Sequence, residues 1–195
     1  MNRIFTCLAA IALVCVLATF AVGLSLRSGN LRDRADTATQ QLGTVHRLSG
    51  IAAGLFVVLV NSVVATYFIG TSRWCKEVSE TYGLAGEYVA RSTQLKRRTF
   101  PLCVAGMLIA VAIVALGGAA DPGAMVRSPE VLFGQKALAA VSWANVHFLA
   151  AALGIAAFLL IFVRQWNNIH ANHEVINDVL AEVQRIRAER GLEAG

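Results

Sequence analysis

The sequence predicts an all-α fold: an integral membrane four-helix up-down bundle with a long cytoplasmic extension of the fourth helix. Hydrophobic residues make up 56% of the 195 residues and charged residues only 15%, whereas about a quarter of the residues in a soluble domain are charged. Four segments contain no Asp, Glu, Lys or Arg, and each exceeds the roughly 20 residues that a helix needs to cross a bilayer. These segments are 4–26, 48–72, 100–120 and 137–163.

We therefore expect residues 1–166 to form a four-transmembrane-helix domain and residues 167–195 to form a cytoplasmic helical tail. The first apolar segment follows Arg3, and small residues at 21–23 have the spacing of a weak signal-peptidase site. Its apolar run is longer than the ~7–15 residues of a signal peptide, which favours a retained membrane anchor.

The Lys and Arg residues predict the orientation. If the amino terminus is inside, eleven of them lie in inner segments and six in outer segments. The positive-inside rule then places both termini in the cytoplasm, in a multi-pass protein of the cell inner (plasma) membrane. The net charge of +5 fits this bias and an attraction to anionic membrane lipid. No basic stripe interleaved with aromatic residues is present, so we expect no nucleic-acid partner.

The inner segment 73–99 predicts an amphipathic loop. Apolar residues recur at helical spacing on both sides of Gly83 and Gly86, which break the segment, so we expect two short amphipathic helices. Pro101 fits the first turn of the third transmembrane helix. The second outer segment has the composition of a loop, with a short interfacial helix around residues 130–136.

Past Arg164 the fourth segment continues with a heptad pattern. Two interpretations remain open: the tail packs on the segment 73–99 of its own chain, or it docks onto a membrane-complex partner or forms a homo-oligomer through Ile169–Ile186. His170 and His173 have the spacing of metal ligands, but without a third ligand nearby a solvated polar face is favoured. The pattern comprises Ile169, Asn172, Ile176, Val179, Val183 and Ile186.

Two histidines occupy matching places in this pattern. His46 opens the outer end of the second apolar segment, and His147 does the same for the fourth. Ionisable residues at membrane depth are costly, so each is a candidate functional residue. The second and fourth helices run in the same direction and lie diagonally in an up-down bundle. We therefore expect the two side chains to face each other in one leaflet.

Small residues follow each histidine on nearly the same helix face. They are Gly50 and Gly54 on the second helix, and Ala151 and Gly154 on the fourth. Such residues leave room for a flat macrocycle, although Gly-x-x-x-Gly also allows two helices to pack closely. Arg47 is placed to pair with a propionate or to anchor the helix at the interface.

Haem iron accepts axial imidazoles, whereas zinc requires more ligands and no Asp, Glu or Cys lies at the same depth. The sequence therefore predicts haem b, with His46 and His147 as axial ligands of the iron. The His-Arg-Leu-x-Gly opening at His46 and the Val-His-x-Leu-Ala-Ala opening at His147 resemble one four-helix half of the haem A synthase family.

In that family each half carries one histidine on its second helix and one on its fourth, so the resemblance implies the same two axial ligands. Residues 96–98 and 116–118 also fit. The chain departs from the family at Gly43, where the family has a glutamate, and it lacks the cysteine pair of the first outer loop. His-Arg-Leu-Ser-Gly is also similar to a helix start in succinate dehydrogenase cytochrome b subunits.

The alternative for the histidines is structural. His46 is then interfacial, and His147 forms hydrogen bonds within the bundle, to Asn61, Ser62 or Asn145. The uncharged run after His147 is also the shorter of the two, which would place that residue deeper in the membrane.

Two functions follow from these alternatives. The first is a small membrane protein that binds b-type haem between its second and fourth helices, for electron transfer or haem handling. The second is a cofactor-free accessory or assembly subunit that acts through its cytoplasmic helical arm. The sequence shows no nucleophile–base–acid set and no intramembrane acid, so neither hydrolysis nor an ion pathway is indicated, and enzymatic activity stays undecided.

Overall fold

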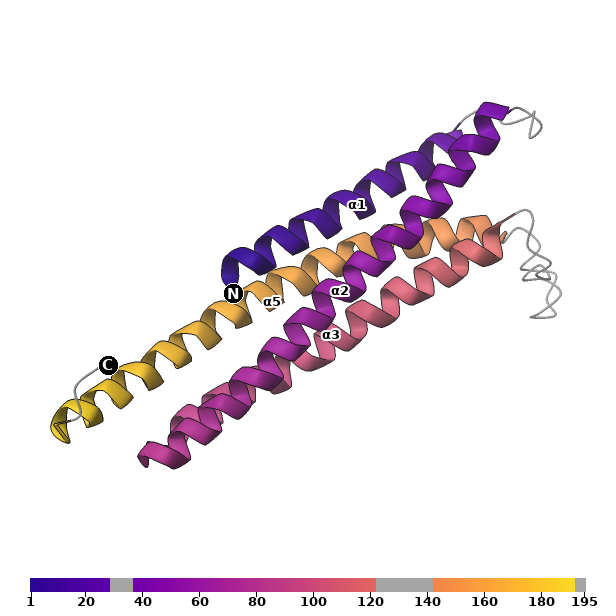
Figure 1. Ribbon diagram of the computed structural model, residues 1–195. Coiled ribbons are helices and arrows are strands. Elements are labelled where there is room, and N and C mark those ends of the chain that lie inside the picture. Colours follow the sequence, from indigo (N-terminus) through magenta and orange to yellow (C-terminus); the bar gives the residue numbers. More distant parts are fainter. Residues whose placement is uncertain (29–36, 122–141, 192–195) are drawn as a thin grey trace, which may run out of the picture.

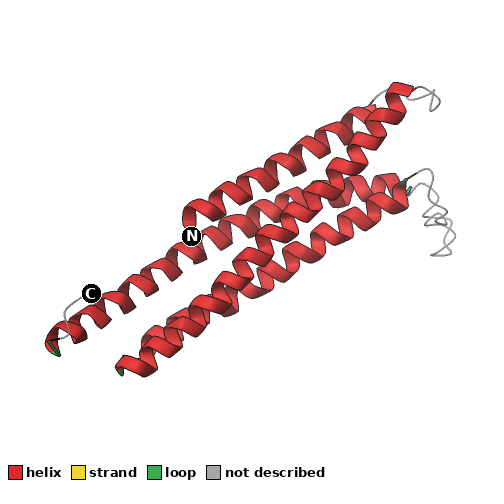
Figure 2. Cartoon of the chain, in the orientation of Figure 1, coloured by secondary structure: helices red, strands yellow, loops and turns green. Residues whose placement is uncertain are grey.

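The computed structural model describes residues 1–28, 37–121 and 142–191, and every regular element among them is an α-helix (Figures 1 and 2). All four helices are long and apolar enough to cross a membrane. This confirms the expectation of an all-helical protein with four candidate membrane spans. The helices are α1 (Asn2–Ser28), α2 (Thr37–Tyr82), α3 (Gly86–Ala120) and α5 (Trp143–Glu189).

The helices form a bundle in which α2 and α5 each pack against both α1 and α3. Direct contact between α2 and α5 is less extensive, which is the pattern of helices that lie diagonally across a core. The end of α1 lies beside the start of α2, at the same end of the bundle as the end of α3 and the start of α5 (Figure 1).

Both α2 and α3 extend far beyond the segments that lack charge. The sequence predicted two short amphipathic helices at 73–99 with a break at Gly83 and Gly86, and the helices and the break are confirmed. Their separation from the membrane helices was wrong, because they are the end of α2 and the start of α3. Only a tight turn separates them, with Gly83 at φ +69°. Pro101 consequently lies inside α3 and not in its first turn. The physical reason is that charge marks where an apolar environment ends, whereas a helix continues through water unless a residue such as Gly breaks it.

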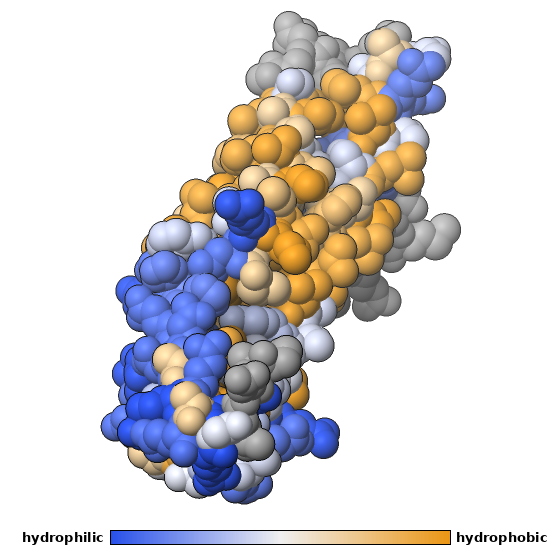
Figure 3. Space-filling view, turned by 60° about the vertical axis from the view of Figure 1, so that its left-hand side comes forward, coloured by the Kyte–Doolittle hydropathy of each residue, from blue (hydrophilic) through white to orange (hydrophobic). Residues whose placement is uncertain are grey.

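Apolar and polar surfaces divide along the length of the bundle. In Figure 3 hydrophobic residues cover the upper part, and hydrophilic residues cover the lower end, where α2, α3 and α5 continue past the start of α1. The core of the apolar part consists mainly of Val and Phe side chains. It includes Val57, Val60, Val64, Phe68, Phe158 and Phe162.

The hydrophilic end has a core of its own. Val175 and Val179 of α5 are buried with Cys75 of α2, and Val183 packs on the same cluster with Trp74, Val78, Leu84, Tyr88 and Leu95. The apolar face of the tail is therefore covered by its own chain, which is the first of the two interpretations. The helix α5 passes through residues 166 and 167 without a break.

A series of buried amide side chains links α2, α3 and α5. Nε2 of Gln165 donates to Oδ1 of Asn61 at 2.9 Å and lies 3.3 Å from Sγ of Cys103. Further along, Nδ2 of Asn172 donates to the hydroxyls of Tyr67 and Thr71, both at 3.1 Å. Hydrogen bonds between buried groups are satisfied in only one relative placement of the helices, so this series fixes their register.

Candidate functional site

The rings of His46 and His147 meet across the bundle. Their centroids are 6.2 Å apart, and their planes are inclined by 74°. The expected difference in depth is absent. The two uncharged runs differ at their other ends, since Arg164 ends the run in α5 earlier than Arg73 ends the run in α2. At the histidine end, the two rings lie at the same level along the bundle. There, Ser142 caps the start of α5 by accepting a hydrogen bond from the backbone N–H of Asn145.

The ring of His46 lies in a notch on α1. Its Nδ1 is 3.1 Å from the backbone oxygen of Thr19, and Gly23 lies one turn further along α1. A Cβ atom added to Gly23 would be only 2.8 Å from Cε1 of the ring. A ring nitrogen that faces a carbonyl oxygen donates its proton there, so a neutral His46 presents its other nitrogen, Nε2, as an acceptor or metal ligand.

The ring of His147 lies in an equivalent notch on α3. A Cβ atom added to Gly117 would be 3.1 Å from Cε1 of His147. The backbone of Ile113, one turn before Gly117, lies beside the ring, and the buried Nδ1 forms no hydrogen bond. Each histidine thus packs on a glycine of the preceding helix and faces the backbone one turn earlier. The hairpins α1–α2 and α3–α5 repeat one local arrangement.

The small residues that follow the histidines on their own helices contact other side chains. A Cβ atom on Gly54 would be 2.9 Å from Cγ2 of Val114, and one on Gly154 would overlap Cδ1 of Ile113. Gly50 faces Thr19 at an ordinary contact distance. These contacts correspond to close helix packing, the second of the two uses predicted for them. Ala151 is partly buried.

Gly23 and Gly117 are the glycines that adjoin the imidazoles, and sequence reasoning missed both. The spacing from each glycine to its histidine differs between the hairpins, because the connecting segments differ in length. The sequence signal was therefore limited to a glycine near the end of each preceding helix.

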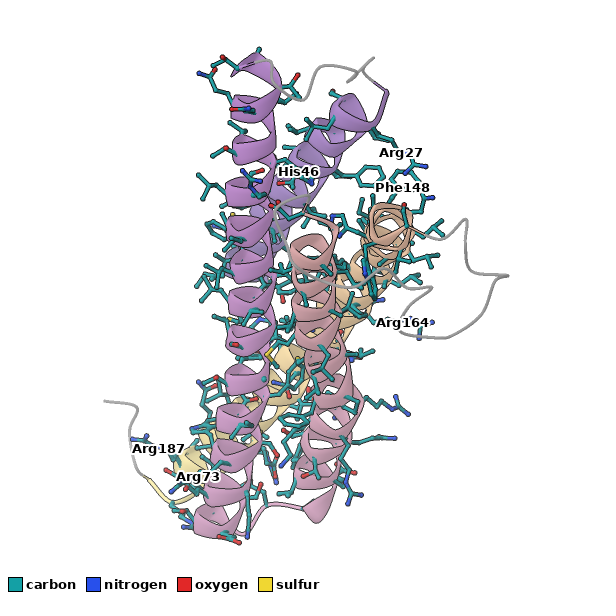
Figure 4. All side chains as sticks on the ribbon, turned by 90° about the vertical axis from the view of Figure 1, so that its right-hand side faces the viewer. Arg27, His46, Arg73, Phe148, Arg164 and Arg187 are labelled. Atoms are coloured by element: carbon teal, nitrogen blue, oxygen red, sulfur yellow. The ribbon has the colours of Figure 1, made fainter. Side chains whose placement is uncertain are left out.

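Two arginine side chains lie at the same end of the bundle as the histidines. Nη1 of Arg47 forms an ion pair of 2.7 Å with Asp121 at the end of α3, so its charge is already paired within the chain. Arg27 donates to Oδ1 of Asn145 at 2.9 Å and lies over the ring of Phe148 at 4.6 Å (Figure 4). Arg27 was not predicted as part of the site.

The partners proposed for a structural His147 are occupied by other groups. The amide of Asn61 bonds to Gln165 and to the backbone oxygen of Val57. Ser62 donates to the backbone oxygen of Val58, and Asn145 accepts from Arg27. Hydrogen bonding to these three residues therefore does not account for the position of His147.

Other candidate ligands lie apart from this pair. Nδ1 of His170 is 3.3 Å from the side-chain nitrogen of Asn2, and its ring stacks on Trp166. His173 is exposed on the same helix. In residues 1–28, 37–121 and 142–191, no three His, Cys, Asp or Glu side chains come together as a metal site.

The arrangement is thus a pair of part-buried imidazoles, each held by a neighbouring helix, at one end of an apolar bundle. Among the described residues it supplies two imidazole nitrogen donors, and the carboxylate of Asp121 at the same end is paired with Arg47. Comparison with protein-family models, with curated proteins and with solved structures gave no match.

Proposed function

We propose that the chain binds haem b between α2 and α5, with His46 and His147 as the axial ligands, and serves electron transfer or haem handling. The observation that supports this proposal is the 6.2 Å between the ring centroids. Metal–imidazole bonds are about 2 Å long and the ring centre lies roughly 1 Å beyond the nitrogen, so two imidazoles that held one iron between them would have centroids about 6 Å apart.

The setting of the rings also suits a ligand role. A ligating histidine usually donates its second N–H to a carbonyl or carboxylate, which fixes the ring and makes the ligating nitrogen more basic. The backbone oxygen of Thr19 is such a partner for His46. For His147 the backbone of Ile113 lies in the equivalent place, but its buried Nδ1 forms no hydrogen bond, so such a partner is present for His46 only. When bound, haem would supply one-electron chemistry that the chain's own side chains do not.

The proposal includes a membrane placement. The four helices would cross the inner (plasma) membrane as an up-down bundle, with both termini and the extension of α5 in the cytoplasm. The support is the excess of Lys and Arg on that side. A fluorescent reporter inserted at Gly83 should fold in the cytoplasm, whereas one that folds only after export should be active when placed within 122–141. The opposite result would reverse the orientation.

The absorption spectrum tests the haem proposal. Protein expressed with ample haem should purify with a Soret band that His46→Ala and His147→Ala each remove. His170→Ala and His173→Ala are the matched controls, because they remove an exposed imidazole from the same chain. A folded wild-type protein without a Soret band would overturn the proposal, and so would equal loss in the controls.

An accessory or assembly role remains the second proposal, supported by the continuation of α2, α3 and α5 past the start of α1 (Figure 1). Deletion of residues 169–191 would uncover Cys75 and its neighbours, so loss of a partner would not separate docking from unfolding. A reversed or added charge at exposed positions of α5 is sharper. A partner that still co-purifies with the Glu174→Lys and Leu180→Glu variants would argue against a docking arm.

A further inference from the structure

A groove runs between the last turns of α2 and the first turns of α3, beyond the apolar surface. One wall is a stripe of α2 residues and the other is a stripe of α3 residues, and the groove encloses roughly 290 Å³. The basic residues Arg73, Lys76 and Lys96 line it on both sides. Its lining consists of Ile69, Ser72, Arg73, Lys76, Val89, Thr93 and Lys96.

The groove lies at the border between the apolar and polar surfaces. Ile69 is 51% exposed and lies one helical turn before Arg73 on α2. Phe100 is 45% exposed and lies one turn beyond Lys96 on α3. Residues four apart share a helix face. Each wall therefore carries a cation with an exposed apolar side chain one turn nearer the membrane.

The charge of the groove is positive after its ion pairs are counted. Arg73 pairs with Glu77 at 2.7 Å, and Lys76 lies 3.7 Å from Glu80, one turn further from the membrane. Lys96 forms no ion pair with any residue that the structure describes. Of the three cations that line the groove, two are thus paired and Lys96 carries the remaining positive charge.

We propose that this groove binds the phosphate headgroup of an anionic phospholipid from the cytoplasmic leaflet. Basic pockets between transmembrane helices on the cytoplasmic side suit such headgroups. The hydroxyls of Ser72 and Thr93 add hydrogen-bond donors to the charge of Lys96, and Ile69 and Phe100 lie where an acyl chain would leave the groove. A free phosphate or an acidic peptide would use the cations but not the apolar rim. The inference rests on the proposed membrane placement and is independent of haem.

Native mass spectrometry of the purified full chain tests this site. Delipidated protein would be titrated with phosphatidylglycerol or with phosphatidylcholine, and a one-to-one adduct is expected with the first only. Each basic residue near a membrane surface contributes about 1 kcal/mol, which corresponds to about fivefold in affinity. Replacing Arg73, Lys76 and Lys96 with Gln should therefore weaken the phosphatidylglycerol adduct at least tenfold.

The matched control is a chain with Arg185, Arg187 and Arg190 replaced by Gln, which loses the same charge at the far end of α5. It should keep the adduct, and Lys96→Arg should keep it as well. Equal loss in the control would overturn the site in favour of diffuse attraction. Full competition by millimolar inorganic phosphate or by an acidic peptide would overturn the lipid as its occupant, as would binding of phosphatidylcholine with equal affinity. A missing Soret band would leave these outcomes unaffected.

Discussion

Gly23 of α1 leaves just enough space for the imidazole of His46 on α2, because a Cβ atom at this glycine would be 2.8 Å from Cε1 of the ring. The contact holds the ring against the backbone oxygen of Thr19. The histidine therefore depends on its neighbouring helix for its position and for its tautomer.

The Gly23→Ala variant should displace the ring. Overpacking of this kind typically costs about 1–3 kcal/mol, and the Soret band should weaken or broaden with it. Gly43→Ala is the control, because no atom lies within 4 Å of its Cβ position and Ala is favoured over Gly in a helix. Thermal unfolding and the absorption spectrum measure both effects. If the two variants behave alike, the notch does not hold the ring.

The Gly106→Ala variant should break the buried amide pair. A Cβ atom there would be 2.7 Å from Oδ1 of Asn61, which accepts the hydrogen bond of Gln165. A buried amide without its partner costs about 1–3 kcal/mol. Gly70→Ala, with nothing within 4 Å of its Cβ position, should cost much less. Unfolding in detergent provides the comparison, and equal costs would argue against the amide pair.

A double-mutant cycle makes the same point independently of absolute stability. Asn61→Ala removes the side chain that Gly106→Ala would strike, so the second substitution should cost less in the presence of the first. Coupled neighbours usually show interaction energies of about 0.5–3 kcal/mol. Additive costs would mean that the two residues do not share a contact.

The Val179→Ala variant should destabilise the hydrophilic end of the bundle. Val179 is fully buried against α2 and α3, and truncation of a buried aliphatic side chain costs about 1–3 kcal/mol. Leu180→Ala is the control, since Leu180 is 44% exposed and such positions usually change stability by less than about 0.5 kcal/mol. Hydrogen exchange of α5 past Ile169 would report the difference. A tail that docks only onto a partner would show no difference in the isolated protein.

The thiol of Cys75 should make stability depend on alkaline pH. Burial raises its pKa above the ordinary value of 9.0, although the nearby hydroxyl of Ser92 opposes this shift. A raised pKa in the folded state means that the folded protein binds the proton of the thiol more tightly than the unfolded protein does. The protein is therefore more stable where the thiol is protonated. The contribution of the thiol is fully present below pH 9.0 and is lost as the pH rises through the folded pKa.

Unfolding of wild type and Cys75→Ala at pH 7 and pH 10 should show a steeper alkaline loss for wild type. The variant removes the titrating group and keeps a small apolar side chain at the same place. Parallel pH profiles would show that Cys75 does not titrate differently on unfolding.

Much of the fold could be predicted because each prediction depended on composition along the chain. The uncharged segments gave four helices of membrane-spanning length, and the heptad pattern past Arg164 gave a continuous α5. Helix ends were predicted less well, since α2 and α3 continue past the uncharged segments without a change in backbone. The amide series was missed because Asn61 and Gln165 are distant in sequence and neither carries a charge.

The histidine pair shows most clearly which features depend on the sequence and which depend on the tertiary structure. The sequence by itself determined that two imidazoles stand at the same end of two apolar helices, because ionisable residues are conspicuous in an apolar run. Only the tertiary structure decided that the rings lie level with each other and that Gly23 and Gly117 hold them. It also decided that Arg47 pairs with Asp121. These relationships depend on which helix faces lie opposite each other. Packing between the helices determines this, and the local sequence pattern of a single helix does not.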